Sequence, residues 1–117
     1  MGNGDRTKDD VLARMALVPR TMEARGLDAS PQLYNKFVQI GDLKMGEILT
    51  IILRDEIGHV AIGNVWFNWL CQQRQLEPIA TFESLRIQYA APKLRPPFNI
   101  EARRQAGFSE AELALLN

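Results

Sequence analysis

Residues 45 to 63 have the sequence MGEILTIILRDEIGHVAIG, and this stretch decides the fold class. At 100° per residue, its apolar positions form one face of a helix that also contains Glu56 and His59. The predicted face consists of Met45, Leu49, Ile52, Leu53, Glu56, His59, Val60, Gly63, Phe67 and Leu70. A carboxylate and the only histidine of the chain are therefore expected where leucines point. Because an unpaired buried charge is costly, both groups should have a partner.

Two long helices dominate the prediction. The helix around this stretch is expected over about 43–75, and an earlier one over about 7–25, with Pro19 bending it and Gly26 ending it. Ser30 and Pro31 have the residue types of an N-cap and first helical position, which predicts a separate short helix to about Ile40.

The remainder is predicted to be a C-terminal extension over 79–117. Short helices are expected at 81–90, 100–106 and 110–116, and Ser109 with Glu112 forms a capping box for the last one. No segment shows strand alternation, so the chain is predicted to be all-α, a single domain fragment with two long antiparallel helices.

Composition excludes several classes of protein. The 14 basic residues match the 14 acidic ones, which argues against nucleic acid as a partner. No apolar run reaches the ~18 residues of a membrane span, and the N-terminus lacks the apolar segment of a signal peptide. The single cysteine, Cys71, excludes an intrachain disulfide and fits a reducing compartment, so a cytoplasmic protein with a packed or interface thiol is expected.

Glu56 and His59 are the strongest candidates for chemistry. A Glu-x-x-His on the inner face of a bundle is the ligand arrangement of carboxylate-bridged di-iron and di-manganese sites. The structural alternative is a satisfied core histidine, with Glu56 paired to an arginine such as Arg14 or Arg20.

Glu23 is the third candidate. It shares a helix face with Leu12, Ala16 and Pro19, so it emerges from an apolar-to-small surface; its alternative is an exposed glutamate at a helix end. One Glu with one Glu-x-x-His makes half of a four-helix carboxylate site. Oxygen-rich ligands with one imidazole per metal suit iron or manganese better than zinc.

Two further groups are predicted to be structural. An aromatic cluster on the long helix is expected to pack in the core, with a surface that binds a partner as the alternative. The cluster consists of Trp66, Phe67, Trp69 and Leu70. The pair Arg103 and Arg104 is expected on a solvated face.

Three segments resemble an uncharacterised ferritin-like bacterial family, domain of unknown function 455. They are LARMALVPRTMEARGLD (12–28), IILRDEIGHVA (51–61) and PFNIEARRQAGF (97–108), and the resemblance covers nearly the whole chain from about residue 8. It implies a ferritin-like bundle with a dinuclear centre, in which Glu23, Glu56 and His59 match half of the ligands. Family members are about twice as long, so the chain resembles their C-terminal half, without the helices that carry the other ligands.

The function expected from this reasoning is binding of two metal ions. Iron is the expected metal and manganese the alternative, with oxidase or oxygenase chemistry if the site is complete; the substrate and the catalytic residues stay open. The partner is predicted to be a second copy in a homodimer or a missing N-terminal half-domain supplied in trans. The alternative is a non-catalytic helical interaction module in which Glu56 and His59 are a buried polar pair.

Overall fold

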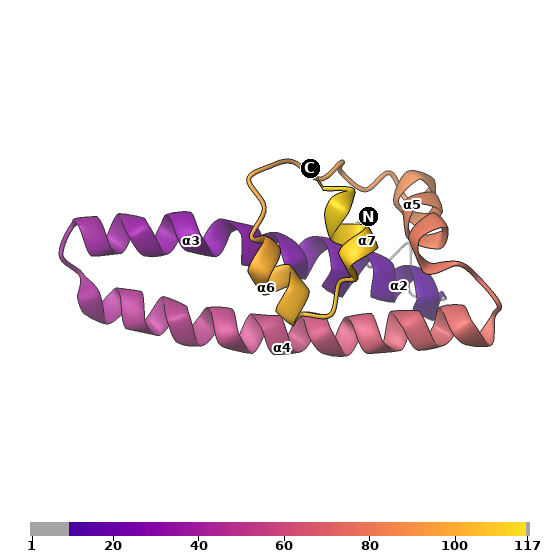
Figure 1. Ribbon diagram of the computed structural model, residues 1–117, viewed down its shortest axis with the longest axis horizontal. Coiled ribbons are helices and arrows are strands. Elements are labelled where there is room, and N and C mark those ends of the chain that lie inside the picture. The colour runs from indigo at the N-terminus through magenta and orange to yellow at the C-terminus, as the bar shows by residue number, and fades with distance from the viewer. Residues whose placement is uncertain (1–9, 117) are drawn as a thin grey trace.

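Two antiparallel helical arms form the framework of the computed structural model, which describes residues 10–116 (Figure 1). The first arm is continuous through α2 (Val11–Leu17), the π-helix η1 (Val18–Glu23) and α3 (Ala24–Gln39). A tight turn leads into α4 (Leu43–Gln73), which returns along the whole first arm. The described residues contain no strand, and the predicted all-α class is confirmed.

Three short helices cover one half of this hairpin. They are α5 (Pro78–Gln88), α6 (Ile100–Gln105) and α7 (Glu110–Ala114). Figure 1 shows them beside α2, η1 and the first turns of α3, whereas the far ends of the two arms extend beyond them. No helix within residues 10–116 is long and apolar enough to span a bilayer. The expected start of the first helix at residue 7 and the character of the N-terminus fall on residues 1–9, outside the described part.

Several helix ends are set by local turn and capping residues that can be recognised in the sequence. Gly41, with φ of +83°, makes the turn between the arms, because the left-handed region carries no penalty for glycine. The Asp42 carboxylate then accepts a hydrogen bond from the Met45 amide at 3.0 Å and starts α4. The capping box of Ser109 and Glu112 is confirmed at the start of α7.

The first arm does not stop at Gly26, and the separate helix predicted from Ser30 onward is wrong. Pro31 lies inside α3 and supplies no amide hydrogen to the Leu27 carbonyl four residues earlier. The Asn99 side-chain amide donates to that carbonyl instead, at 3.2 Å. Ser30 is not an N-cap: its hydroxyl donates to the Gly26 carbonyl within the helix. A tertiary contact therefore overrides two local stop signals.

The first of the three short helices, α5, begins earlier than predicted. It starts at Pro78 rather than near Thr81, because the Glu77 carboxylate accepts hydrogen bonds from the amides of Ile79 and Ala80 at 3.1 and 2.5 Å. Proline is well suited to the first helical position, where its missing N–H has no partner to lose.

The core consists of two clusters along the hairpin. One joins α3 and α4 to the C-terminal helices: Ala24, Leu27, Val60, Ala102, Ala106, Phe108 and Leu113. The other joins α2 and α4 to α5: Leu12, Ala13, Ala16, Phe67, Cys71 and Leu85. Cys71 is fully buried, as expected for a packed thiol, and burial raises its pKa. The Asn64 amide donates to the Ala106 carbonyl at 2.7 Å and ties α4 to the end of α6.

Between the two clusters, η1 lies directly on α4. The expected bend at Pro19 takes the form of a π-helix, in which the Thr21 hydroxyl donates to the Ala16 carbonyl at 2.9 Å. Pro19 and Gly63 are both buried and face each other. A β-carbon at residue 63 would overlap the Pro19 ring, so glycine is required for this close approach.

Replacing Gly63 by alanine is expected to lower the free energy of unfolding by roughly 1–3 kcal/mol, the usual cost of overpacking. Gly58, on the same helix, is a matched control because a β-carbon there meets nothing within 4 Å. Gly58→Ala should raise the free energy of unfolding by about 0.5–1 kcal/mol through helix propensity. Urea unfolding monitored by circular dichroism measures both changes. Equal effects of the two substitutions would contradict the assigned contact.

Candidate metal centre

Glu56 and His59 lie side by side on α4. The Nδ1 atom of His59 is 3.8 Å from Oε2 of Glu56, and the two side chains are 65% and 28% exposed. The Cγ atom of Glu56 is 3.9 Å from the position of a β-carbon on Gly26, an ordinary van der Waals distance, so the carboxylate side chain lies beside the first arm at this residue. Glu56 therefore lies on the side of α4 that faces the first arm, whereas His59 is exposed at the surface.

Glu23 is on the opposite arm, at the last position of η1. It is half-buried and precedes Gly26 by about one helical turn, so it is not the exposed helix-end glutamate of the structural alternative. No ion pair joins Glu23 to His59 among the residues that the structure describes. Within residues 10–116, no three Asp, Glu, His or Cys side chains are close enough together to hold a metal ion. In one chain, Glu56 and His59 are therefore adjacent, and Glu23 does not form a metal-binding cluster with them.

The expected burial of the apolar face of α4 is wrong at two positions. Ile52 is 53% exposed, and His59 is exposed rather than placed among the leucines. The buried face is centred on Val60, Phe67 and Cys71, and Pro19 against Gly63 fixes that direction. His59 is one residue before Val60, hence about 100° away from the centre of the buried face.

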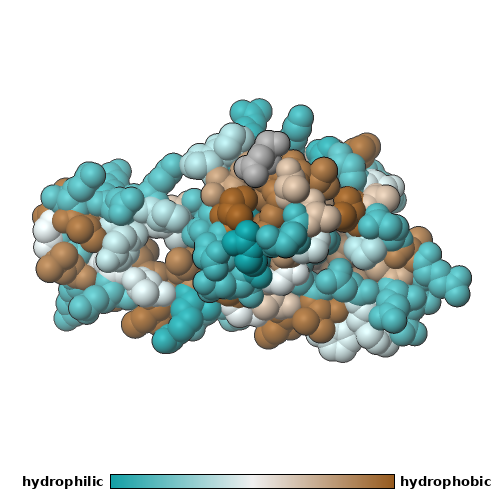
Figure 2. All heavy atoms as spheres, in the orientation of Figure 1, coloured by the Kyte–Doolittle hydropathy of each residue, from teal (hydrophilic) through white to brown (hydrophobic). Residues whose placement is uncertain are grey.

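Around His59, α4 exposes a stripe of large apolar side chains, which we call the α4 stripe: Ile48, Ile51, Ile52, Ile62, Val65, Trp66 and Trp69. Apolar patches are visible over α4 along the lower edge of Figure 2. The core-packing prediction is confirmed for buried Phe67 but is wrong for the two tryptophans, whose rings meet edge to face at 5.9 Å on the surface. A helix that is apolar on both sides is typical of an element between two packing layers.

Arg20 is buried, which the sequence pattern did not indicate. Its Nη2 atom is 2.8 Å from Oε1 of Glu112 on α7, and its guanidinium carbon is 4.4, 4.7 and 5.1 Å from the ring centres of Phe67, Phe82 and Phe108. Burial lowers the pKa of Arg20, and the neighbouring Glu112 carboxylate counteracts that shift. The suggested pairing of Glu56 with Arg20 is therefore wrong.

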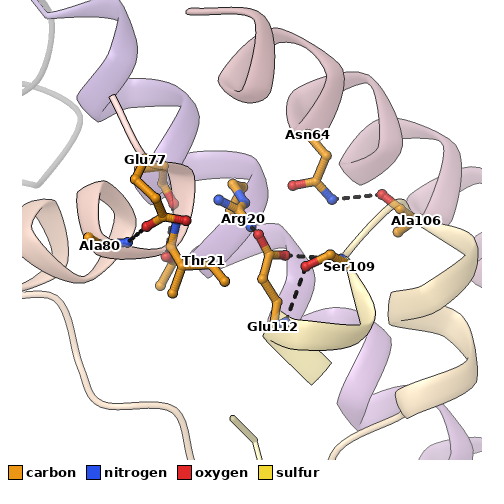
Figure 3. A network of polar contacts seen from close by, with 10 residues as sticks. Arg20, Thr21, Asn64, Glu77, Ala80, Ala106, Ser109 and Glu112 are labelled. Atoms are coloured by element: carbon orange, nitrogen blue, oxygen red, sulfur yellow. Dashed lines mark hydrogen bonds and ion pairs between the residues drawn. The ribbon is translucent and has the colours of Figure 1, made fainter. Parts of the chain in front are cut away.

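Figure 3 shows how Arg20 is surrounded. Glu112 extends toward it from α7 and is held at its base by the capping box with Ser109, while Asn64 of α4 bonds to Ala106 nearby. The Nε and Nη1 atoms of Arg20 have no hydrogen-bond partner in the part of the chain that the structure describes. The nearby rings compensate this charge in part, because aromatic faces attract cations.

Arg103 is also buried, so the expected solvated pair of arginines is half wrong. Its Nε and Nη2 atoms bond both Asp28 oxygens, at 2.9 and 2.6 Å, and its side chain is 1% exposed. Arg104 is at the surface and pairs with Glu101 and Glu110. Two buried arginines thus fasten the C-terminal extension to the first arm.

Glu112→Gln tests the first of these fastenings. Glutamine keeps the capping-box geometry of α7 but leaves Arg20 as an unpaired buried cation, so the free energy of unfolding should fall by about 3 kcal/mol. Glu110→Gln is the control, since this glutamate pairs with surface-exposed Arg104 and should change little. Urea titration of the three proteins provides the comparison, and a similar stability for both variants would contradict a buried ion pair.

Comparison with known proteins places the chain in a family. The family model described as "Protein of unknown function (DUF455)" matches residues 2–114. An "Uncharacterized protein" of Haemophilus influenzae is 49% identical over 107 residues, which are 92% of this chain and 37% of that protein. The chain thus spans little more than a third of this relative's length, and no solved structure matches it significantly. The match over nearly all of its length shows that the chain belongs to the family of unknown function DUF455.

Proposed function

We propose that this chain is one half of a ferritin-like centre that binds two metal ions, with iron as the preferred metal and manganese as the alternative. The observation that carries the proposal is the adjacency of His59 and Glu56, at 3.8 Å, in the middle of the α4 stripe. Carboxylate oxygens and one imidazole per metal are the ligands that iron and manganese accept in helical bundles.

The ligand set of one chain is incomplete. Ferritin-like dinuclear sites use two glutamates and two Glu-x-x-His pairs, and this chain offers Glu23 with one Glu56–His59 pair. The donor types fit, whereas a closed site needs a second set facing the first. Exposure of His59 supports this interpretation, because a ligand at the middle of an interface is accessible until the interface forms.

A second copy of the chain is the occupant we propose for the α4 stripe. A twofold axis near His59 would bring two α4 helices face to face and supply a second Glu56–His59 pair, while each chain would contribute its Glu23 from its own first arm. Exposed tryptophans and isoleucines at helical spacing are suited to such an interface core. In longer relatives the remainder of the polypeptide is the other possible source of the second set, since the chain covers 37% of the Haemophilus protein.

The roles follow from position. Glu56 and His59 are proposed as terminal or bridging ligands, and Glu23, on the facing arm, as a bridging carboxylate. A pair of metal ions held by these residues would supply activation of oxygen or peroxide, which is the basis of oxidase and oxygenase chemistry. The chain's own part is to hold these carboxylates half-buried beside apolar side chains, where water has limited access.

A helical interaction module is the second candidate function. It is favoured by the α4 stripe and by the lack of any three-residue metal cluster among the described residues. In that case Glu56 and His59 form a polar pair at the centre of a protein–protein interface and fix its register, as single polar residues do in coiled coils.

Metal content and molecular mass, measured together, separate these candidates. After anaerobic loading with ferrous iron, the protein should elute at the mass of two chains and retain about one iron per chain, two per dimer. Glu56→Ala and His59→Ala should each lose most of the metal, whereas Glu47→Ala, an exposed position on the same helix, should not.

Three outcomes contradict parts of the proposal. A dimer without iron or manganese would favour the interaction module. Metal retained only after mixing with a longer family member would assign the second ligand set to the missing half rather than to a second copy. Equal metal content in all variants would remove Glu56 and His59 from the site.

The interface has its own test. Ile62→Glu places a charge at a 60% exposed position of the α4 stripe and should convert the dimer to a monomer, because an unpaired charge at an interface core is costly. Ile87→Glu on α5 is the control: it is 64% exposed and lies away from the stripe. Light scattering at matched concentrations reports the mass, and a wild-type monomer would contradict the proposed contact.

A further inference from the structure

A cavity of about 720 Å³ lies on the side of the hairpin that the C-terminal extension covers. α5, α7 and the extended segment 91–99 surround it, and Arg20 contributes to its lining from η1. In Figure 1 this segment arches from α5 to α6 above the same side. None of the proposed metal ligands, Glu23, Glu56 and His59, lines the cavity, so it is a separate feature of the fold.

The walls are mostly apolar. Side chains from three different elements converge there, including Ile79, Phe82, Leu94, Phe98, Phe108 and Leu113. The volume is in the range of small-molecule sites, which combine apolar walls with a few polar groups that orient the ligand. A ligand of matching chemistry has an apolar body and one polar end.

The charged groups of the lining favour an anionic end. Four cations contribute to the lining, Arg20, Arg86, Lys93 and Arg103, against two carboxylates, Glu83 and Glu112. Each arginine already has a carboxylate partner, which is Glu112 for Arg20, Glu83 for Arg86 and Asp28 for Arg103.

Lys93 is the cation left over. Among residues 10–116 it forms no ion pair within 4 Å; its side chain is exposed, and the carboxylate on which its charge acts, Glu83, is already paired with Arg86. It lies in the extended segment that borders the cavity. Arg20 supplies a second feature of the same sign, because two of its nitrogens have no hydrogen-bond partner among the described residues. A cavity with one unmatched cation and a partly unsatisfied guanidinium is complementary to a single negative charge.

We propose that this cavity binds a monocarboxylate with an aliphatic body of medium length, its carboxylate held by Lys93 and its chain among the leucine and phenylalanine side chains. The site is independent of the metal centre: it requires neither iron nor a second copy of the chain. It assigns to the C-terminal extension a ligand-binding role in addition to its packing against the first arm.

Isothermal titration calorimetry with decanoate, below its micellar concentration, tests the proposal. Decanoate should bind at one site per chain, and decanol, which has the same chain without the charge, at least tenfold more weakly. Lys93→Gln should weaken decanoate about tenfold and leave decanol unchanged. Lys36→Gln, on α3 and away from the cavity, is the matched control and should have no effect.

A second pair of variants locates the binding. Ala80 is exposed and borders the cavity, so Ala80→Trp should obstruct it and abolish decanoate binding without unfolding the protein. Ala29→Trp, at an exposed position of α3 outside the cavity, should bind as the wild type does. The proposal is overturned by lack of saturable binding, by equal affinities for decanoate and decanol, or by binding that persists in Ala80→Trp, which would place the ligand outside this cavity.

Discussion

The packing of Pro19 against Gly63 is the constraint on which the rest of the structure depends. A proline ring can lie on a helix this closely only where the helix carries no side chain, so the contact fixes both the distance and the rotation of α4 relative to the first arm. Arg20 follows directly and is carried into the interior, where three phenylalanine rings and Glu112 surround it. The position of α7 is thereby tied to the same contact.

The same constraint determines where the chemistry can be. Glu23 ends the π-helix in which Pro19 is the second residue, and Glu56 meets the first arm at Gly26, one turn further on. Short π-helical segments within α-helices are frequent at functional sites. The rotation that buries Val60 leaves His59 on the outer side of the pair. The proposed centre would therefore be shared with another layer and not enclosed within one chain.

Much of the fold was predictable, because its signals are local. The bounds of α4 follow from Asp42 and from the lack of proline until residue 78, and the predicted end differs from the observed one by two residues. The capping box of α7 is equally local. The first arm was predicted wrongly because a partner distant in sequence, Asn99, compensates Pro31. Pro31 and Asn99 are too far apart in the sequence for a local pattern to reveal this compensation.

The adjacency of Glu56 and His59 was predictable, but their exposure was not. Their spacing predicted that Glu56 and His59 lie together, because residues three positions apart are neighbours on the surface of a helix. Apolar residues on nearly all sides of α4 could not indicate which side is buried, so the exposure of His59 was missed. Arg103 was misjudged for another reason: its partner Asp28 is 75 residues away, and the charge pattern around Arg104 is that of a surface.

The continuity of α3 also has a consequence for the order of assembly. Its Leu27 carbonyl is satisfied by a residue near the end of the chain, so the first arm cannot reach its final form during synthesis until Asn99 has left the ribosome.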